Sequence, residues 1–151
     1  MALHLKDTAL LRGQGYIDGQ WVGADSGAVF GVTDPASGAR LAEVADKGAT
    51  ETRRAIEAAE RALPAWRGKT AKERAATMRR WFELILANAD DLALLMTSEQ
   101  GKPLAEARGE VAYGASFVEW FAEEGKRVYG DTIPSPTNDR RLIVLKQPIG
   151  V

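Results

Sequence analysis

The chain has 151 residues, of which 45% are hydrophobic and 27% charged, and its formal net charge is −1. This is the composition of a globular domain; the weak charge argues against nucleic-acid binding, and the longest apolar runs fall far short of the roughly 20 residues that span a bilayer. The absence of cysteine excludes a disulfide framework and a cysteine nucleophile within these residues, and the start of the chain lacks a signal-peptide pattern, so a cytoplasmic location is expected.

The region before residue 50 is predicted to be rich in β-strands. Residues 16–22 place Asp18 and Gly19 between two short alternations of apolar and polar residues, which is typical of a hairpin with a type I′ turn. Two more short strands are predicted at residues 29–33 and 41–44, because the segment between them is rich in turn-forming residues.

Helices are predicted after residue 50. Apolar residues recur at helical spacing after Thr50, and Pro64 is expected to end this first helix at the residue before it. Thr70 and Glu73 then form a capping-box pattern, which predicts a second amphipathic helix over residues 71–87.

A third and a fourth helix follow. The third is expected to close at Gly101, and Pro103 opens the fourth, which is predicted to continue from residue 104 to residue 127. Residues 111–122 are almost entirely apolar, so this helix must be buried on several sides, and we infer that further chain or a partner subunit covers it. The aromatic residues of the second and fourth helices are predicted to lie in the core; they are Trp81, Phe82, Phe117, Trp120 and Phe121.

A last strand is predicted around residues 142–145. Its flanking charges, Arg140, Arg141 and Lys146, are a common protection for an edge strand, and no partner strand is visible in the sequence.

Two patterns that resemble functional motifs have simpler explanations. Gly13 and Gly15 lack the third glycine and the following helix of a dinucleotide-binding turn, so they are interpreted as an ordinary loop. Glu119, Glu123 and Arg127 are spaced four apart, which predicts a ladder of ion pairs on one helix face and not an acid–base pair.

Three ordered segments carry a resemblance to a known family: residues 97–103, with the motif Ser-Glu-Gln-Gly-Lys-Pro, residues 119–134 and residues 141–151. Together they resemble the amino-terminal third of the NAD(P)-dependent aldehyde dehydrogenases, and within that family they are most similar to the succinate-semialdehyde dehydrogenases. The resemblance implies an α/β fold with short strands, then four helices, then the start of a β-arm.

The same resemblance implies a division of the chain. Residues 1–129 would form the amino-terminal part of the coenzyme-binding domain, and residues 130–147 the first strand of an oligomerisation arm. Residues 148–151 would return towards the coenzyme-binding domain, where the sequence is truncated. The partner of the arm strand would come from the far carboxyl end of the complete chain.

The family oxidises aldehydes by cysteine attack, hydride transfer to NAD or NADP, and hydrolysis of the resulting thioester. These parts are expected beyond Val151, so no catalytic or cofactor-binding residue is assigned within the chain. The resemblance therefore predicts a fragment that is inactive alone. It would belong to a homo-oligomeric enzyme, a dimer or tetramer, that oxidises succinic semialdehyde to succinate with NADP or NAD.

Two smaller sets of site residues follow by position in the family. Gly109 and Tyr113 match the place where members line the substrate entrance. Val32, Thr33 and Glu99 match positions whose backbone oxygens hold a structural monovalent cation in some members.

Two alternatives stay open at this stage. The chain could be a stand-alone interaction or oligomerisation module that docks on full-length subunits through the apolar helix and the last strand. The complete enzyme could also act on another aldehyde, because no residue before Val151 decides the substrate or the choice between NAD and NADP. An isolated chain with an uncovered apolar helix is further expected to aggregate or to stay partly molten.

Overall fold

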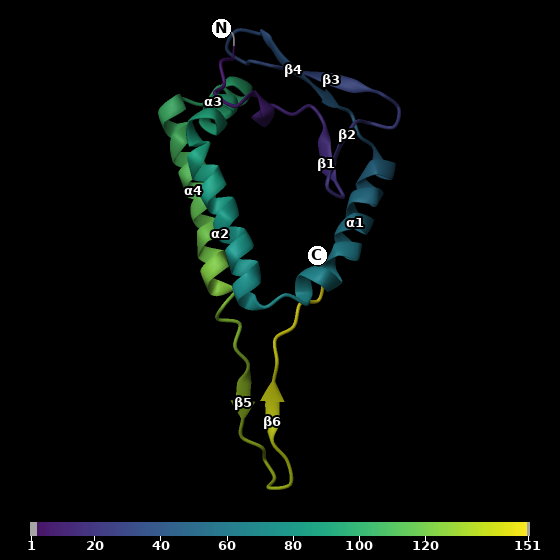
Figure 1. Ribbon diagram of the computed structural model, residues 1–151, viewed down its shortest axis with the longest axis vertical. Coiled ribbons are helices and arrows are strands. Elements are labelled where there is room, and N and C mark those ends of the chain that lie inside the picture. Colours follow the sequence, from purple (N-terminus) through teal and green to yellow (C-terminus); the bar gives the residue numbers. More distant parts are fainter. Residues whose placement is uncertain (1–2, 151) are drawn as a thin grey trace.

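The structure is a computed structural model that describes residues 3–150. Its strands form three separate two-stranded antiparallel sheets, the last three helices pack against one another, and the first helix stands apart from them (Figure 1). None of the helices formed by the described residues is long and apolar enough to cross a membrane. In chain order the elements are a 3₁₀ helix η1 (Thr8–Leu10), β1 (Gly15–Ile17), β2 (Gln20–Val22), β3 (Val29–Thr33), β4 (Arg40–Ala45), α1 (Ala49–Arg67), α2 (Ala71–Ala87), α3 (Ala89–Gln100), α4 (Leu104–Glu124), β5 (Asp131–Ile133) and β6 (Leu142–Val144).

The predicted first hairpin is confirmed. Asp18 and Gly19 have φ values of 52° and 79°, the left-handed conformations that a type I′ turn requires at both central positions. The turn brings Tyr16 opposite Trp21, and the two rings meet edge to face with their centroids 5.2 Å apart. The predicted strands at 29–33 and 41–44 are also present, as the paired strands β3 and β4.

Helix α1 is longer than predicted, because Pro64 lies inside it. A proline cannot donate a hydrogen bond to the preceding turn, but its carbonyl can still accept one. The Pro64 carbonyl accepts a bond of 3.0 Å from the Gly68 amide, which completes a last turn and carries the helix to Arg67. The expectation that Pro64 ends the helix was therefore wrong.

The capping signals of the next helices are confirmed. The Thr70 amide donates to the Glu73 carboxylate over 2.8 Å, and the Glu73 amide donates to the Thr70 hydroxyl over 3.3 Å, so α2 begins at Ala71. Gly101, with φ 79°, ends α3 in a left-handed conformation.

Helix α4 ends at Glu124, three residues earlier than the predicted Arg127. The amides of Lys126 and Arg127 bond to the carbonyls of Glu123 and Glu124, over 3.1 and 2.8 Å. A bond to the third preceding residue is tighter than that of an α-helix, so the chain leaves the helical path after Gly125.

The buried core is built from small side chains. Helix α4 packs against α2 and α3, and Ala93, Ala107 and Val111 form a buried cluster at this junction. The prediction of an aromatic core was wrong: Phe82 is only partly buried, and the other members of that set are exposed. The buried apolar residues are Ala58, Ala75, Ala93, Ala107, Val111, Ala115 and Ala122.

The last two strands form a hairpin that extends away from the helices (Figure 1). Strand β6 pairs with β5, so the expectation of an unpartnered strand was wrong. Strand β5 has only three residues, too few to show a period-two pattern in the sequence. Gly130 lies at the base of this hairpin, where a Cβ atom would collide with the Val144 carbonyl. Val151, the end of the segment predicted to return to the coenzyme-binding domain, lies outside the described residues.

Candidate functional site

Four aromatic side chains form one exposed side of α4. Tyr113, Phe117, Trp120 and Phe121 follow each other at helical spacing, and they are 63, 47, 63 and 57% exposed. The small buried residues of the same helix face α2 and α3 instead. We call these four residues the α4 aromatic face.

A groove runs along this face beside α2. Its volume is about 880 Å³, and Phe117, Trp120 and Phe121 supply its apolar lining. Charged side chains also line it, including Arg79 of α2 and Glu119 of α4. Such a surface offers apolar contact flanked by polar groups, which is typical of a protein interface and not of an enclosed ligand pocket.

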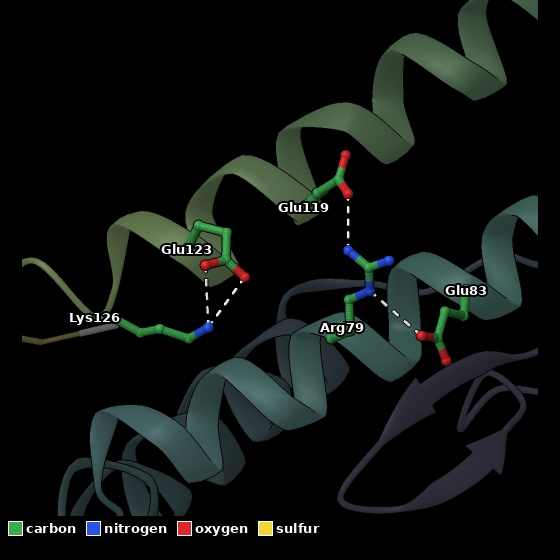
Figure 2. Close-up of polar contacts among 5 residues, drawn as sticks. All are labelled: Arg79, Glu83, Glu119, Glu123 and Lys126. Atoms are coloured by element: carbon green, nitrogen blue, oxygen red, sulfur yellow. Dashed lines mark hydrogen bonds and ion pairs between the residues drawn. The ribbon is translucent and has the colours of Figure 1, made fainter.

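Figure 2 shows that Arg79 joins the two helices beside this groove. Its Nη1 donates to the Glu119 carboxylate over 2.8 Å, and its Nε donates to the Glu83 carboxylate over 3.3 Å. The Arg79 guanidinium also lies over the Phe82 ring, 4.8 Å from the ring centroid. All the ionic partners are about half exposed, so these pairs contribute more to the orientation of the side chains than to stability.

The predicted ladder of Glu119, Glu123 and Arg127 is absent from the described residues. Lys126 donates to both Glu123 carboxylate oxygens over 3.1 and 3.0 Å (Figure 2), and Arg127 donates to Glu124 over 2.9 Å. The ladder prediction was wrong because α4 ends before Arg127, which removes that side chain from the helical register.

The two predicted substrate-entrance residues lie beside each other. Gly109 and Tyr113 line a shallow hollow of about 360 Å³ on α4, together with Lys102, Glu106 and Glu110. A Cβ atom at Gly109 would meet open space, so this position contributes room. Tyr113 stacks edge to face on Phe117, with the ring centroids 4.8 Å apart, and so connects the hollow to the α4 aromatic face. Their entrance role remains a prediction.

The three positions predicted to hold a monovalent cation lie on two elements that contact each other, β3 and α3. Val32 and Thr33 are at the end of β3, where the pairing with β4 shifts register, and Glu99 is exposed in the last turn of α3. Gly101, just after α3, lies against Pro35, just after β3. The fold therefore brings the two segments together, and the cation role stays a prediction.

Gly13 and Gly15, which are interpreted from the sequence as an ordinary loop, do not form a phosphate-binding turn for NAD or NADP. Gly15 begins a strand of a tight hairpin instead of leading into a helix. The connection from β4 to α1 does lead from a strand into a helix, but Glu51 already occupies that helix start. The Glu51 carboxylate accepts bonds from the amides of Asp25 and Gly48, over 2.8 and 3.1 Å, so a second anion would be repelled there.

One polar cluster was missed by the sequence reasoning. The buried Asp91 carboxylate at the start of α3 accepts bonds from the amides of Lys6 and Asp7, over 3.1 and 2.8 Å. The neighbouring Asp90 pairs with Lys6 and with Arg108, which lower the pKa of its carboxyl below the ordinary value. Paired acidic residues at a helix start indicated only a favourable helix dipole, and no local signal showed that the chain terminus reaches them.

Comparison with known proteins shows the family to which this chain belongs. The sequence pattern of the aldehyde dehydrogenase family matches residues 21–151. The chain belongs to the aldehyde dehydrogenase family. It is 64% identical to the glutarate-semialdehyde dehydrogenase of Pseudomonas putida over 149 residues, which are 99% of this chain and 31% of that protein. It is 61% identical to the NADP-dependent succinate-semialdehyde dehydrogenase of Escherichia coli, with the same coverage.

A solved structure confirms the fold of this family member. The crystal structure of succinate-semialdehyde dehydrogenase from Burkholderia pseudomallei matches 97% of this chain with a TM-score of 0.95 and 64% identity, and the match covers 30% of that chain. The resemblance and the α/β fold predicted from the sequence are thus confirmed. The chain spans about a third of the length of the relatives it matches.

Proposed function

We propose that this chain is the amino-terminal part of a dehydrogenase that oxidises succinic semialdehyde to succinate with NADP or NAD. The observation that carries the proposal is its 61–64% identity to enzymes named for succinate or glutarate semialdehyde. In this reaction the aldehyde carbon loses a hydride to NAD(P), water supplies the second carboxylate oxygen, and two protons are released.

The chain would supply a scaffold and not the reacting groups. A covalent route through a thiol requires a cysteine, and the sequence contains none. The β4–α1 turn is also filled by Glu51, as described above. We therefore expect the isolated chain to be inactive.

We further propose the division into residues 1–129 as part of the coenzyme-binding domain and 130–147 as part of an oligomerisation arm. The β5–β6 hairpin supports the arm, because it extends from the helical body and carries exposed apolar residues such as Ile143 and Leu145. The outer edges of β5 and β6 have no partner strand among residues 3–150, so each could pair with another strand in a homo-oligomer.

The test replaces the corresponding third of the Escherichia coli relative by this chain. We expect the full-length chimera to reduce NADP with succinic semialdehyde, and the isolated 151-residue chain to show no activity under the same conditions. A folded chimera without activity would refute the enzymatic role. Activity of the isolated chain would refute the expectation that the reacting groups lie elsewhere.

Glutarate semialdehyde is the second candidate substrate, because a relative named for it is as similar as those named for succinate semialdehyde. The two aldehydes differ by one methylene group. The ratio of kcat/KM for the two substrates, measured in the chimera and in its Escherichia coli parent, tests whether this third of the chain affects the choice. If the ratio in the chimera differs from that in its parent, and Tyr113→Ala in the chimera abolishes this difference, the result would support the predicted substrate entrance.

A further inference from the structure

The α4 aromatic face is a large apolar surface for so small a chain. Its four rings lie on one side of α4 at helical spacing, and all four are exposed. Contiguous apolar patches of this kind mark sites where proteins bind other protein surfaces. The face is therefore expected to be covered by another polypeptide segment.

The backbone that carries this face has the same conformation as the matching part of a much longer relative. The TM-score of 0.95 compares this chain with 30% of a succinate-semialdehyde dehydrogenase, in which the remaining 70% of the polypeptide is also present. The helices beneath the face pack closely around Ala93, Ala107 and Val111, so the face is held in place before anything binds.

We propose that the α4 aromatic face and its groove with α2 bind the remaining two thirds of a semialdehyde dehydrogenase polypeptide in trans, as a separate chain. The inference rests on the proposed function. It goes further, because it makes the 151-residue chain a docking module that needs no covalent link to the rest of the enzyme.

The groove defines the chemistry of the segment that occupies it. Phe117, Trp120 and Phe121 require an apolar counterpart, and aromatic anchors of this kind contribute most of the binding energy of protein interfaces. The charged groups that line the groove are already paired: Arg79 with Glu119 and Glu83, Glu123 with Lys126, and Glu124 with Arg127. An apolar segment can therefore bind there without leaving an unpaired charge buried.

The experiment co-expresses the tagged chain with the complementary two thirds of the Escherichia coli relative, beginning after the matched region. We expect a one-to-one complex that co-purifies and reduces NADP with succinic semialdehyde. The variants W120E and F121E should weaken the complex by about 30-fold or more, as loss of an interface hot spot does. Tyr16, 62% exposed on the β1–β2 hairpin, provides the matched control Y16E, which should bind normally.

A separate measurement keeps misfolding from imitating a loss of docking. Trp120 and Phe121 are exposed, so W120E and F121E should retain the far-UV circular dichroism of the unmodified chain. Absence of a complex with the unmodified chain, or a complex insensitive to both variants, would refute the proposal. A homodimer of the 151-residue chain that the same variants disrupt would also refute it, because a second copy would then be the occupant.

The outcomes separate docking from catalysis. A complex that depends on Trp120 and Phe121, together with a folded but inactive full-length chimera, would support docking while refuting the proposed function. An active full-length chimera without any complex in trans would support the proposed function and refute docking.

Discussion

The alanine core makes a quantitative prediction at Ala107. This residue has 0% exposure and packs with Ala93 and Val111, while Leu92 and Met96 of α3 lie partly buried around them. Ala107→Leu inserts three carbon atoms where none fits without displacing α3 from α4. Overpacking of this kind costs about 1–3 kcal/mol, and the partly buried neighbours can shift outward, so we expect about 1–2 kcal/mol.

The assay is urea unfolding followed by far-UV circular dichroism. With a slope of about 2 kcal/mol per molar urea, the midpoint of Ala107→Leu should fall by about 0.5–1 M. Ala105 is exposed on the same helix, so Ala105→Leu should change the free energy of unfolding by no more than about 0.5 kcal/mol. Equal midpoints for the two variants would refute the conclusion that small side chains set the distance between α3 and α4.

Three further predictions concern polar and glycine positions. Asp91→Ala removes the acceptor of the Lys6 and Asp7 amides, so it should cost about 1–3 kcal/mol and speed amide hydrogen exchange in the amino-terminal segment; unchanged exchange would refute a stabilising role of these two bonds. The Glu51 carboxylate accepts hydrogen bonds from the amides of Asp25, Glu51 and Gly48, which lower its pKa below the ordinary value of 4.5. The stability that this carboxylate contributes is therefore present above pH 4.5 and is lost as the pH falls through the lowered pKa. In Glu51→Gln, the free energy of unfolding should therefore fall less steeply as the pH is lowered. An unchanged pH profile would refute the contribution of the Glu51 carboxylate. Gly130→Ala should open the β5–β6 hairpin, seen as faster proteolysis there, and normal resistance would refute the close approach to Val144.

Local signals in the sequence predicted local structure well. The Asp18-Gly19 turn, the Thr70 cap and the Gly101 helix end each depend on one or two neighbouring residues, and all three are confirmed. Pro64 misled the prediction because its effect depends on how much helix follows it. Near a helix end, the lost hydrogen bond matters less than it does in the middle.

The arrangement in space was harder to predict, for a physical reason. Hydrophobicity shows that Trp120 and Phe121 favour burial, but it does not show whether the covering surface lies within these residues. The Arg79–Glu119 pair joins positions 40 residues apart and leaves no periodic pattern in the sequence. The entrance role of Gly109 and Tyr113 was predicted only through the family resemblance, because neither position carries a chemical signature of its own.

The hydrogen bonds to the Asp91 carboxylate also have a consequence for the order in which the chain folds. Its bond to the Asp7 amide closes a loop of 84 residues, and closing so long a flexible loop costs roughly 4 kcal/mol of entropy. Helices α2, α3 and α4 contact each other across short connections, so they can assemble quickly without this cost. We therefore expect the amino-terminal segment to attach after these helices and to be released before they separate.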